Sequence, residues 1–215
     1  EKGGVQPEFK YHKYKENGFK TPTGKIELYS TLLEGEGIDP LPYFEEPPES
    51  PYSTPELAKK YPFILITGAR IPMFFQSEFR QMPTLRKGRP EPECELHPET
   101  AASLGVKAGD WVSIETERGR CRQKVKIFKG IDPNVVHAQH GWWFPEEDSP
   151  DHGNWRSNAN ALTSMQPPYC SAMGTYQLRA LLCRVLPVED SEEPWHPDLP
   201  EKFNSNVADI QEWNS

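Results

Sequence analysis

The sequence predicts a mainly β fold, a small barrel with a few short helices, flanked by extended proline-rich arms. Short apolar runs bounded by proline, glycine or asparagine recur along the middle of the chain, and such runs are typical of strands. Between them, one segment carries the start and stop signals of a helix. Many short strands with a short helix among them indicate a small barrel.

The composition is uneven and indicates the domain boundaries. The chain has 215 residues, with 23 prolines and 35% apolar residues, against about 5% proline and roughly 45–50% apolar residues in average domains. A chain of this length holds one well-filled domain with extensions. We assign residues 1–60 to a connecting arm, residues 61–186 to the barrel, and residues 187–215 to an acidic tail.

In the arm, residues 23–29 alternate in character, and Ile26 and Leu28 share one face, so a strand is predicted there. The prolines that follow exclude a continuous helix or a central strand. They are Pro40, Pro42, Pro47, Pro48, Pro51 and Pro55. Such an arm is expected to wrap over the surface of something larger.

The barrel opens with the apolar run at residues 63–66, which predicts a buried strand. Residues 95–104 then predict the end of a strand that passes into a short helix. Pro98 suits the first turn of that helix, and Gly105 suits the position just after its last turn.

A hairpin is the clearest element of the sequence. Residues 111–116 and 121–128 alternate apolar and polar side chains on either side of a short turn. Two further strands are predicted at residues 135–138 and 178–186, and the second is apolar enough to be central. Between them, residues 141–169 form a polar, aromatic loop.

The charge pattern favours a small anionic ligand over a nucleic acid. The formal net charge is −8, whereas a nucleic-acid surface needs a basic stripe. Residues 70–89 run against this trend, with Glu78 as their single acid. Their basic residues are Arg70, Arg80, Arg86, Lys87 and Arg89. No apolar run approaches the roughly 18 residues of a membrane span, and residues 1–18 lack the apolar core of a secretion signal.

Polar groups cluster just after the first strand of the barrel. They are Thr67, Gly68, Arg70, Gln76, Ser77 and Arg80. Glycine lets the backbone approach a ligand closely, and guanidinium groups suit phosphates. The pattern fits a site for an anionic cofactor. It also fits an ordinary turn at the end of a core strand, with solvated arginines around it.

Other kinds of site lack a supporting pattern. The cysteines (Cys94, Cys121, Cys170 and Cys183) form no CxxC pair, so they indicate free buried thiols and not a disulfide framework or a metal site. His137 and His140 would point to opposite faces of a strand, which favours structural histidines over a metal cluster with Asp151 and His152. No Walker A, GxGxxG or GxSxG motif occurs.

Taken in order, five segments of residues 61–186 resemble the C-terminal dinucleotide-binding domain of the dimethyl sulfoxide reductase family. Members of this family are molybdenum or tungsten oxidoreductases that hold the metal between two molybdopterin guanine dinucleotides. The segments are TGAR with QSEFR, ELHPETAASLGVKAGDWVSIETERGR, HGWWFPE, NANALT and YQLRALLCRV. TPTGKIELYS resembles the junction before this domain, and HGWWFPE is most similar to members related to acetylene hydratase and to polysulfide or thiosulfate reductases.

The resemblance implies a six-stranded double-psi β-barrel with short helices, and it implies which residues contact the cofactor. Thr67, Gly68 and Arg70 match a turn whose backbone contacts the cofactor. Gln76 and Ser77 match a His-Ser or His-Thr pair at the pterin or the phosphates, with an amide in place of the titratable imidazole. The other matches are Arg80 and Arg179 as cations, Trp143 (or Trp142) as an aromatic ring, Asn160 (or Asn158) at the pterin edge, and Gln177 as a helper of Arg179.

The resemblance also implies where the chemistry lies. The family's metal ligand and any iron–sulfur cysteines belong to N-terminal domains, so this chain is expected to hold no catalytic and no metal-binding residue. It would bind bis-molybdopterin guanine dinucleotide, with molybdenum or tungsten, as one part of a larger prokaryotic enzyme in the cytoplasm or periplasm. Its partners would be the other domains of that enzyme and an iron–sulfur electron-transfer subunit, without nucleic acid or membrane insertion. Alone it is expected to be catalytically incompetent.

Two alternatives stay open at this point. One is a separate small subunit of a split molybdopterin or tungstopterin enzyme. The other is a double-psi barrel used as a protein-interaction module, with vestigial cofactor residues. The proline-rich segments at both ends favour the cofactor-binding domain of a larger enzyme, because such segments pack on a body that this chain does not contain.

Overall fold

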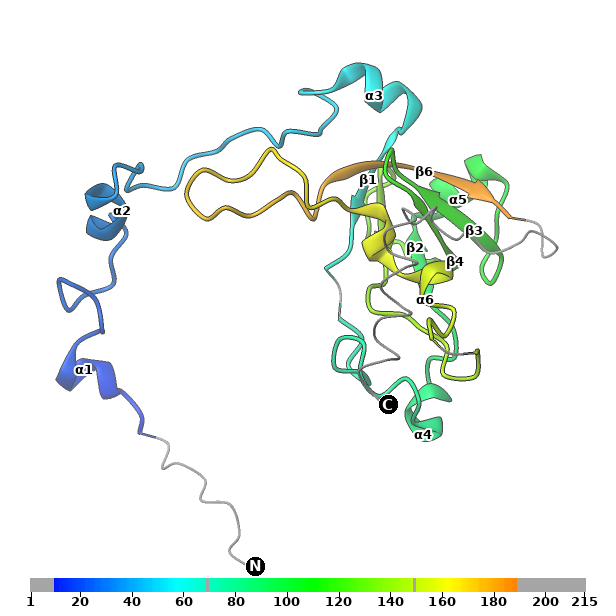
Figure 1. Ribbon diagram of the computed structural model, residues 1–215, viewed down its shortest axis with the longest axis horizontal. Helices are drawn as coiled ribbons and strands as arrows, with labels where there is room; N and C mark the ends of the chain where they lie inside the picture. Colours follow the sequence, from blue (N-terminus) through cyan, green and yellow to red (C-terminus); the bar gives the residue numbers. More distant parts are fainter. Residues whose placement is uncertain (1–9, 69, 149, 189–215) are drawn as a thin grey trace, which may run out of the picture. The chain divides into compact units, whose positions relative to one another are not determined.

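The computed structural model describes residues 10–68, 70–148 and 150–188 (Figure 1). They form two compact units. The first unit contains residues 10–45 and 171–173, and the second contains the rest of the described chain. The predicted acidic tail lies outside the described residues, apart from its first two positions.

The second unit contains a closed barrel of six strands, which confirms the predicted fold class. The strands are β1 Phe63–Ile66, β2 Glu93–Leu96, β3 Trp111–Glu115, β4 Arg120–Ile127, β5 Val135–Ala138 and β6 Leu181–Pro187. They follow one another around the barrel in the order β1-β5-β2-β4-β3-β6. β1 runs parallel to β5 and β2 runs parallel to β4, whereas the other neighbours are antiparallel.

Apolar side chains from the strands fill the barrel interior. Leu65 of β1, Val112 of β3 and Val136 of β5 belong to one buried cluster and are inaccessible to solvent. Because side chains alternate along a strand, only every second residue of these strands points into this interior. Closure pairs each strand on both sides, so strands as short as these have no open edge to protect.

Short helices connect the strands. α5 (Pro98–Leu104) is the helix predicted from the sequence, with Gly105 at a φ of 69° just after its last turn. The other helices were not predicted, because each is too short to show an apolar period. They are α3 Pro55–Lys60, α4 Pro83–Arg86, α6 Asn154–Ser157 and the 3-10 helix η1 Ala159–Leu162 in the second unit, with α1 Lys13–Asn17 and α2 Thr31–Gly35 in the first. Among the described residues, no helix has the length and apolar character to cross a membrane.

Two strand predictions need correction. Residues 23–29 do not form a strand but run through turns and bends, and Ile26 and Leu28 are 68% and 82% exposed. A strand needs a partner, and within the described chain this segment pairs with none. β6 begins at Leu181 and not at residue 178, because Ala180 has a φ of 58°, which breaks extended backbone.

Residues 46–60, which the sequence places in the connecting arm, lie within the second unit. Glu49 and Ser50 are only 6% and 4% exposed. Pro55 does not interrupt this segment but starts α3, because proline at the first helical position removes a donor that has no intrahelical partner there.

The cysteines differ sharply in accessibility. Cys94, Cys121 and Cys183 are buried in the barrel, and Cys170 is exposed. Burial raises the pKa of Cys121 to about 12, and it also raises the pKa values of Cys94 and Cys183. Since the thiolate is the reactive form, we expect a maleimide dye near neutral pH to label only Cys170 in the native chain. Denaturant should expose the other three.

Mass spectrometry of the labelled chain checks this expectation. A Cys170→Ser variant should show no rapid labelling until it is unfolded. Rapid labelling of two or more thiols in the native chain would contradict the burial of these side chains.

Candidate functional site

The candidate site lies where two parallel strands end. β1 and β5 run side by side in the same direction, with Ile66 opposite His137. The residues that follow the two strands therefore leave the barrel at the same end. As a result, Nδ1 of His140 lies 3.0 Å from the carbonyl oxygen of Thr67, although 73 positions separate them in the chain.

Two cavities adjoin at this end of the barrel. The larger has a volume of about 510 Å³ and the smaller about 270 Å³. Gln76, His140 and Asn160 line both of them. The structure thus brings together eight of the residues proposed from the sequence: Thr67, Gly68, Arg70, Gln76, Ser77, Trp143, Asn160 and Arg179.

Gly68 and Arg179 are in direct contact in the smaller cavity. A Cβ atom on Gly68 would lie 3.0 Å from Cζ and 3.1 Å from Nη2 of Arg179, so the guanidinium rests against bare backbone. Arg70 lines the same cavity. Arg70 and Arg179 are exposed and form no ion pair with another described residue. Two cations with unneutralised charge at one cavity fit an anionic ligand.

Asn158 and Asn160 have different roles. Asn158 caps η1, because its Oδ1 accepts a hydrogen bond from the Asn160 backbone N–H at 2.9 Å, and its amide donates to Asn154. The Asn160 side chain forms no hydrogen bond within the described chain and lines both cavities. The donor and acceptor of the Asn160 amide are therefore available to a ligand, whereas those of Asn158 are largely used within the protein.

The loop at Gln76 and Ser77 packs on the segment after β5. Trp143 Nε1 donates to the Ser77 carbonyl over 2.6 Å. Gln76 has a φ of 56°, and a Cβ atom on Gly141 would lie 3.0 Å from its carbonyl oxygen. Glycine is required at 141 for two reasons, its own φ of 69° and this close approach. These contacts fix the cavity wall formed by Gln76.

Arg80 supports the site from behind instead of lining it. It is 1% exposed, and its Nε and Nη2 donate to the carbonyls of Gly141, Gln76 and His140 over 3.1 to 3.3 Å. Its Cζ lies 4.0 Å from the ring centroid of Phe74 and 4.1 Å from that of Trp142. Burial, followed by the nearby Arg86, lowers the pKa of Arg80 to about 10, so the side chain stays charged at neutral pH. Arg80 therefore lines neither cavity, and its side chain holds two loops together.

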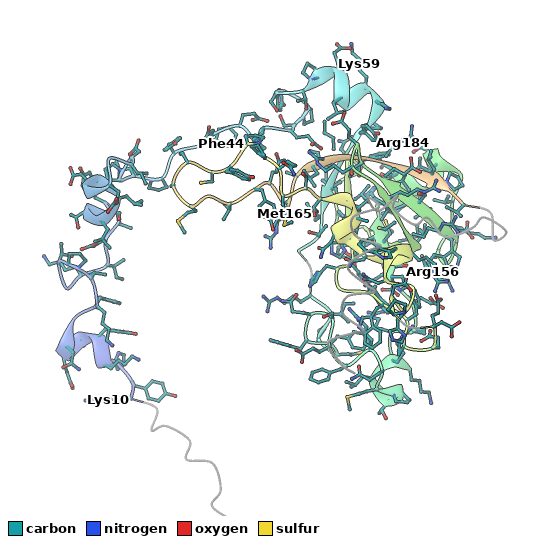
Figure 2. The ribbon with its side chains drawn as sticks, in the orientation of Figure 1. Lys10, Phe44, Lys59, Arg156, Met165 and Arg184 are labelled. Carbon is teal, nitrogen blue, oxygen red and sulfur yellow. The ribbon has the colours of Figure 1, made fainter. Side chains whose placement is uncertain are left out.

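Two further arginines contact aromatic rings near Arg80. Cζ of Arg86 lies 5.2 Å from the Trp142 ring and 5.6 Å from the Phe144 ring. Cζ of Arg156, which Figure 2 labels, lies 4.1 Å from the Phe144 ring, and Arg156 pairs with Glu147. No local sequence pattern indicates these contacts, because the residues come from three separate segments.

A buried amide pair anchors the same loop to the barrel. Gln123 of β4 donates to the Gln139 carbonyl over 2.7 Å, and the Gln139 N–H donates back to the Gln123 side chain over 2.9 Å. The Gln139 side chain accepts from Trp142 Nε1 over 2.9 Å. These bonds satisfy polar groups that water does not reach. They fix the start of the loop that carries His140.

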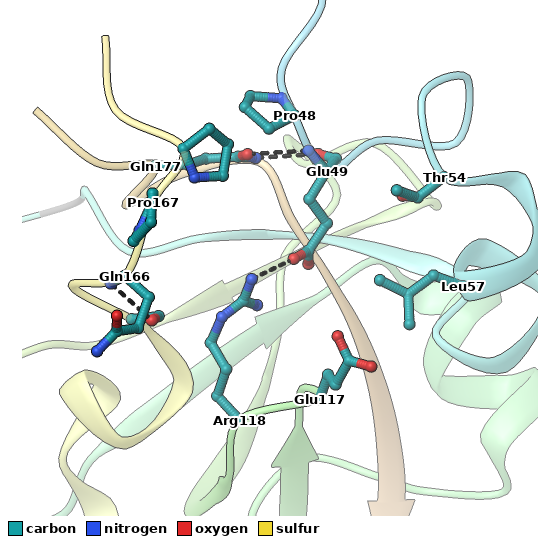
Figure 3. A pocket seen from close by; sticks show the side chains of 11 residues that line it. Pro48, Glu49, Thr54, Leu57, Glu117, Arg118, Gln166, Pro167 and Gln177 are labelled. Atoms are coloured by element: carbon teal, nitrogen blue, oxygen red, sulfur yellow. Dashed lines mark hydrogen bonds and ion pairs between the residues drawn. The ribbon is translucent and has the colours of Figure 1, made fainter.

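Gln177 is not among the residues that line the two cavities, and it borders a third cavity of about 340 Å³ (Figure 3). Its side chain forms two hydrogen bonds with the backbone of Glu49, of 3.1 and 2.9 Å. The Glu49 carboxylate accepts from the Leu182 N–H over 2.6 Å and pairs with Arg118 over 2.6 Å. Gln177 therefore anchors the chain two residues before Arg179, instead of contacting the cavity itself.

The histidines lie in different surroundings, because β5 ends at Ala138 and His140 belongs to the loop that follows. His137 is buried, and its Nδ1 lies 3.3 Å from Glu95 Oε2. Burial lowers the pKa of His137, and Glu95 partly opposes this effect. His140 instead lines both cavities, so its interpretation as a structural residue was incomplete. The position of His140 at the cavities follows from the parallel pairing of β1 and β5, which no local sequence pattern indicates.

Comparison with known proteins places this site in context. Residues 63–180 match the family model of the molydopterin dinucleotide binding domain. The chain is 37% identical over 189 residues to a dopamine dehydroxylase from Eggerthella lenta, covering 85% of this chain and 18% of that protein. It is 44% identical over 131 residues to acetylene hydratase from Syntrophotalea acetylenica, covering 61% of this chain and 18% of that protein.

Two further comparisons also match only part of a longer protein. Dimethyl sulfoxide reductase DmsA of Escherichia coli is 33% identical over 162 residues, covering 70% of this chain and 19% of that protein. Among solved structures, acetylene hydratase from Pelobacter acetylenicus superposes with a TM-score of 0.72 at 36% identity, covering 80% of this chain and 24% of that chain. The chain thus spans less than a quarter of the length of each of these relatives.

Proposed function

Because this chain belongs to the molydopterin dinucleotide binding domain family, we propose that its two adjoining cavities hold one molybdopterin guanine dinucleotide. Molybdopterin as the cofactor class follows from the family. The guanine form, and molybdenum or tungsten as the metal, are part of the proposal. When bound, the metal centre supplies the redox or hydration chemistry, and the residues of this chain bind and orient the cofactor.

The chemistry of the lining fits this cofactor. A pterin dinucleotide presents hydrogen-bond donors and acceptors along the edges of its ring systems and carries two phosphates. Gln76 and Asn160 supply amides for the edges, and Arg70 and Arg179 supply cations for the phosphates. The observation that carries the proposal is the exposed Arg179 guanidinium on bare Gly68 backbone, in the cavity that Asn160 also lines.

We further propose that the chain works as one domain of a larger enzyme, because it covers only 18% of the dopamine dehydroxylase and acetylene hydratase sequences. The other domains would hold the metal ligand and any iron–sulfur cluster, and an iron–sulfur subunit would exchange electrons with them. The described residues contain no group of histidine, cysteine and carboxylate side chains suited to a metal. The isolated chain is therefore expected to bind cofactor without turnover.

An NMR titration tests the binding role. Molybdopterin guanine dinucleotide, released anaerobically from a known enzyme, is added to the labelled chain while amide shifts are followed. We expect shifts centred on Gly68, Gln76, Ser77, Asn160 and Arg179, and an Asn160→Ala variant should bind more weakly by about tenfold. The matched Asn134→Ala variant changes an exposed asparagine outside the lining of both cavities and should bind normally.

The titration also separates the proposal from its alternatives. A folded chain with no shift at these residues, at cofactor concentrations that saturate an intact relative, would contradict a site formed by this domain alone. Binding that survives in both Asn160→Ala and Arg179→Ala would place the cofactor elsewhere.

A further inference from the structure

His140 lies between two oxygen atoms where the two cavities meet. Its Nδ1 lies 3.0 Å from the carbonyl oxygen of Thr67, and its Nε2 lies 3.0 Å from the side-chain oxygen of Gln76. Both His140 and Gln76 line both cavities. The pair therefore forms part of the surface that meets the ligand.

The protonation state of His140 dictates the orientation of the Gln76 amide. The Thr67 carbonyl can only accept a hydrogen bond, so Nδ1 of His140 must donate. In neutral His140, Nε2 is then an acceptor, and Gln76 must turn its NH₂ group toward it. In doubly protonated His140, Nε2 is a donor, and Gln76 must turn its oxygen toward it. The two ends of an amide are nearly equal in shape, so a half-turn satisfies either state.

The backbone of Gln76 is held in place, so the side-chain amide is the part that can rotate when His140 gains or loses a proton. Arg80 Nη2 donates to the Gln76 carbonyl over 3.2 Å, and Gly141 packs against the same oxygen. The His140 ring is held in turn by Thr67. A proton gained or lost at His140 is thus converted into the rotation of one side-chain amide.

We propose that His140 is a positioning residue that decides whether Gln76 offers the cofactor a hydrogen-bond donor or an acceptor. With neutral His140, Gln76 turns its oxygen to the cavity and accepts from an N–H of the pterin edge. With doubly protonated His140, Gln76 turns its NH₂ group to the cavity and donates to a pterin carbonyl or a phosphate oxygen. The identity of the ligand in this inference rests on the proposed function.

Charged groups surround His140, and an anionic ligand changes their balance. Arg70 and Arg179 line the smaller cavity with His140, and Arg80 donates to its carbonyl oxygen. The titratable groups nearby are Asp151 and His152 in the larger cavity and, on β5, His137, which faces Glu95. A bound phosphate neutralises the arginines, so protonation of His140 and binding of an anion should reinforce each other.

The test follows both side chains by NMR in the ¹⁵N-labelled chain without cofactor, from about pH 8 to about pH 5, the range in which histidine titrates. We expect the neutral ring of His140 to carry its proton on Nδ1. The Gln76 NH₂ signals should move with the same midpoint as the ring nitrogens. In Gln76→Glu, whose carboxylate can only accept, that midpoint should rise by about one pH unit or more.

A control and a binding measurement complete the design. His152→Gln removes the other imidazole of the larger cavity and should leave the Gln76 response intact. With cofactor present, affinity should change about tenfold across the titration, and His140→Gln, which cannot titrate, should remove this change.

Two results would overturn the inference: a neutral ring protonated on Nε2, or Gln76 signals that do not follow the titration. Coupled titration in a chain that binds no cofactor at either pH would contradict the proposed function instead, and would leave the coupling of His140 to Gln76 established.

Discussion

Replacing Arg80 with methionine is expected to lower the free energy of unfolding by about 3 kcal/mol. The carbonyls of Gly141, Gln76 and His140 would lose a charged donor at a site that is 1% exposed. Phe74 and Trp142 would also lose the cation that packs against their rings, a contact worth about 2 kcal/mol when desolvated. The apolar methionine fills part of the space, which limits the loss.

Urea unfolding followed by tryptophan fluorescence measures this effect. Arg80→Lys keeps the charge but cannot reach three carbonyls with one ammonium. Its free energy of unfolding should therefore lie between those of the unaltered chain and Arg80→Met. Arg89→Met is the matched control, because the Arg89 ion pair with Glu93 is partly exposed and should be worth less than about 1 kcal/mol. A loss below about 1 kcal/mol in Arg80→Met would show that the buried guanidinium does not hold the loops.

Replacing Arg179 with alanine is expected to weaken cofactor binding by about 10- to 100-fold while leaving stability unchanged. The side chain is exposed and forms no ion pair within the described chain, so folding does not depend on it. A phosphate in the smaller cavity would lose a charge-assisted hydrogen bond. Arg179→Lys should recover part of the affinity, because it restores the charge without the planar pair of donors.

Two further variants locate the effect. Gly68→Ala would place a Cβ atom 3.0 Å from Cζ of Arg179, which forces the guanidinium off the backbone, and we expect a smaller loss of about threefold. Arg184→Ala is the control, since Arg184 (Figure 2) pairs with Glu115 on the barrel wall and lies outside both cavities. Equal affinity of Arg179→Ala and the unaltered chain, by isothermal titration calorimetry, would remove Arg179 from the site.

Local sequence patterns predicted the elements whose hydrogen-bond partners lie nearby in the chain. The hairpin of β3 and β4 and the helix α5 follow from alternation, a proline start and a glycine stop. The strand predicted at residues 23–29 had equally good alternation and does not form. Alternation describes only one strand, and the partner that a strand needs is decided elsewhere in the chain.

The residues predicted for the candidate site also fall into two groups, those that line the cavities and those that do not. Eight residues proposed from motif order line the two cavities, whereas Arg80 and Gln177 act behind them. An arginine that reaches a ligand and an arginine buried against two rings look identical in sequence. The difference depends on Phe74 and Trp142, which lie on separate loops.

Short segments of the sequence predicted most of the barrel strands, the family resemblance and the residue types that suit a pterin dinucleotide. The parallel pairing of β1 and β5, which brings His140 to Thr67 and Gln76 at one end of the barrel, emerges only from the folded chain. Parallel strands are joined through distant crossovers, so their pairing depends on the closure of the whole barrel and on no local pattern.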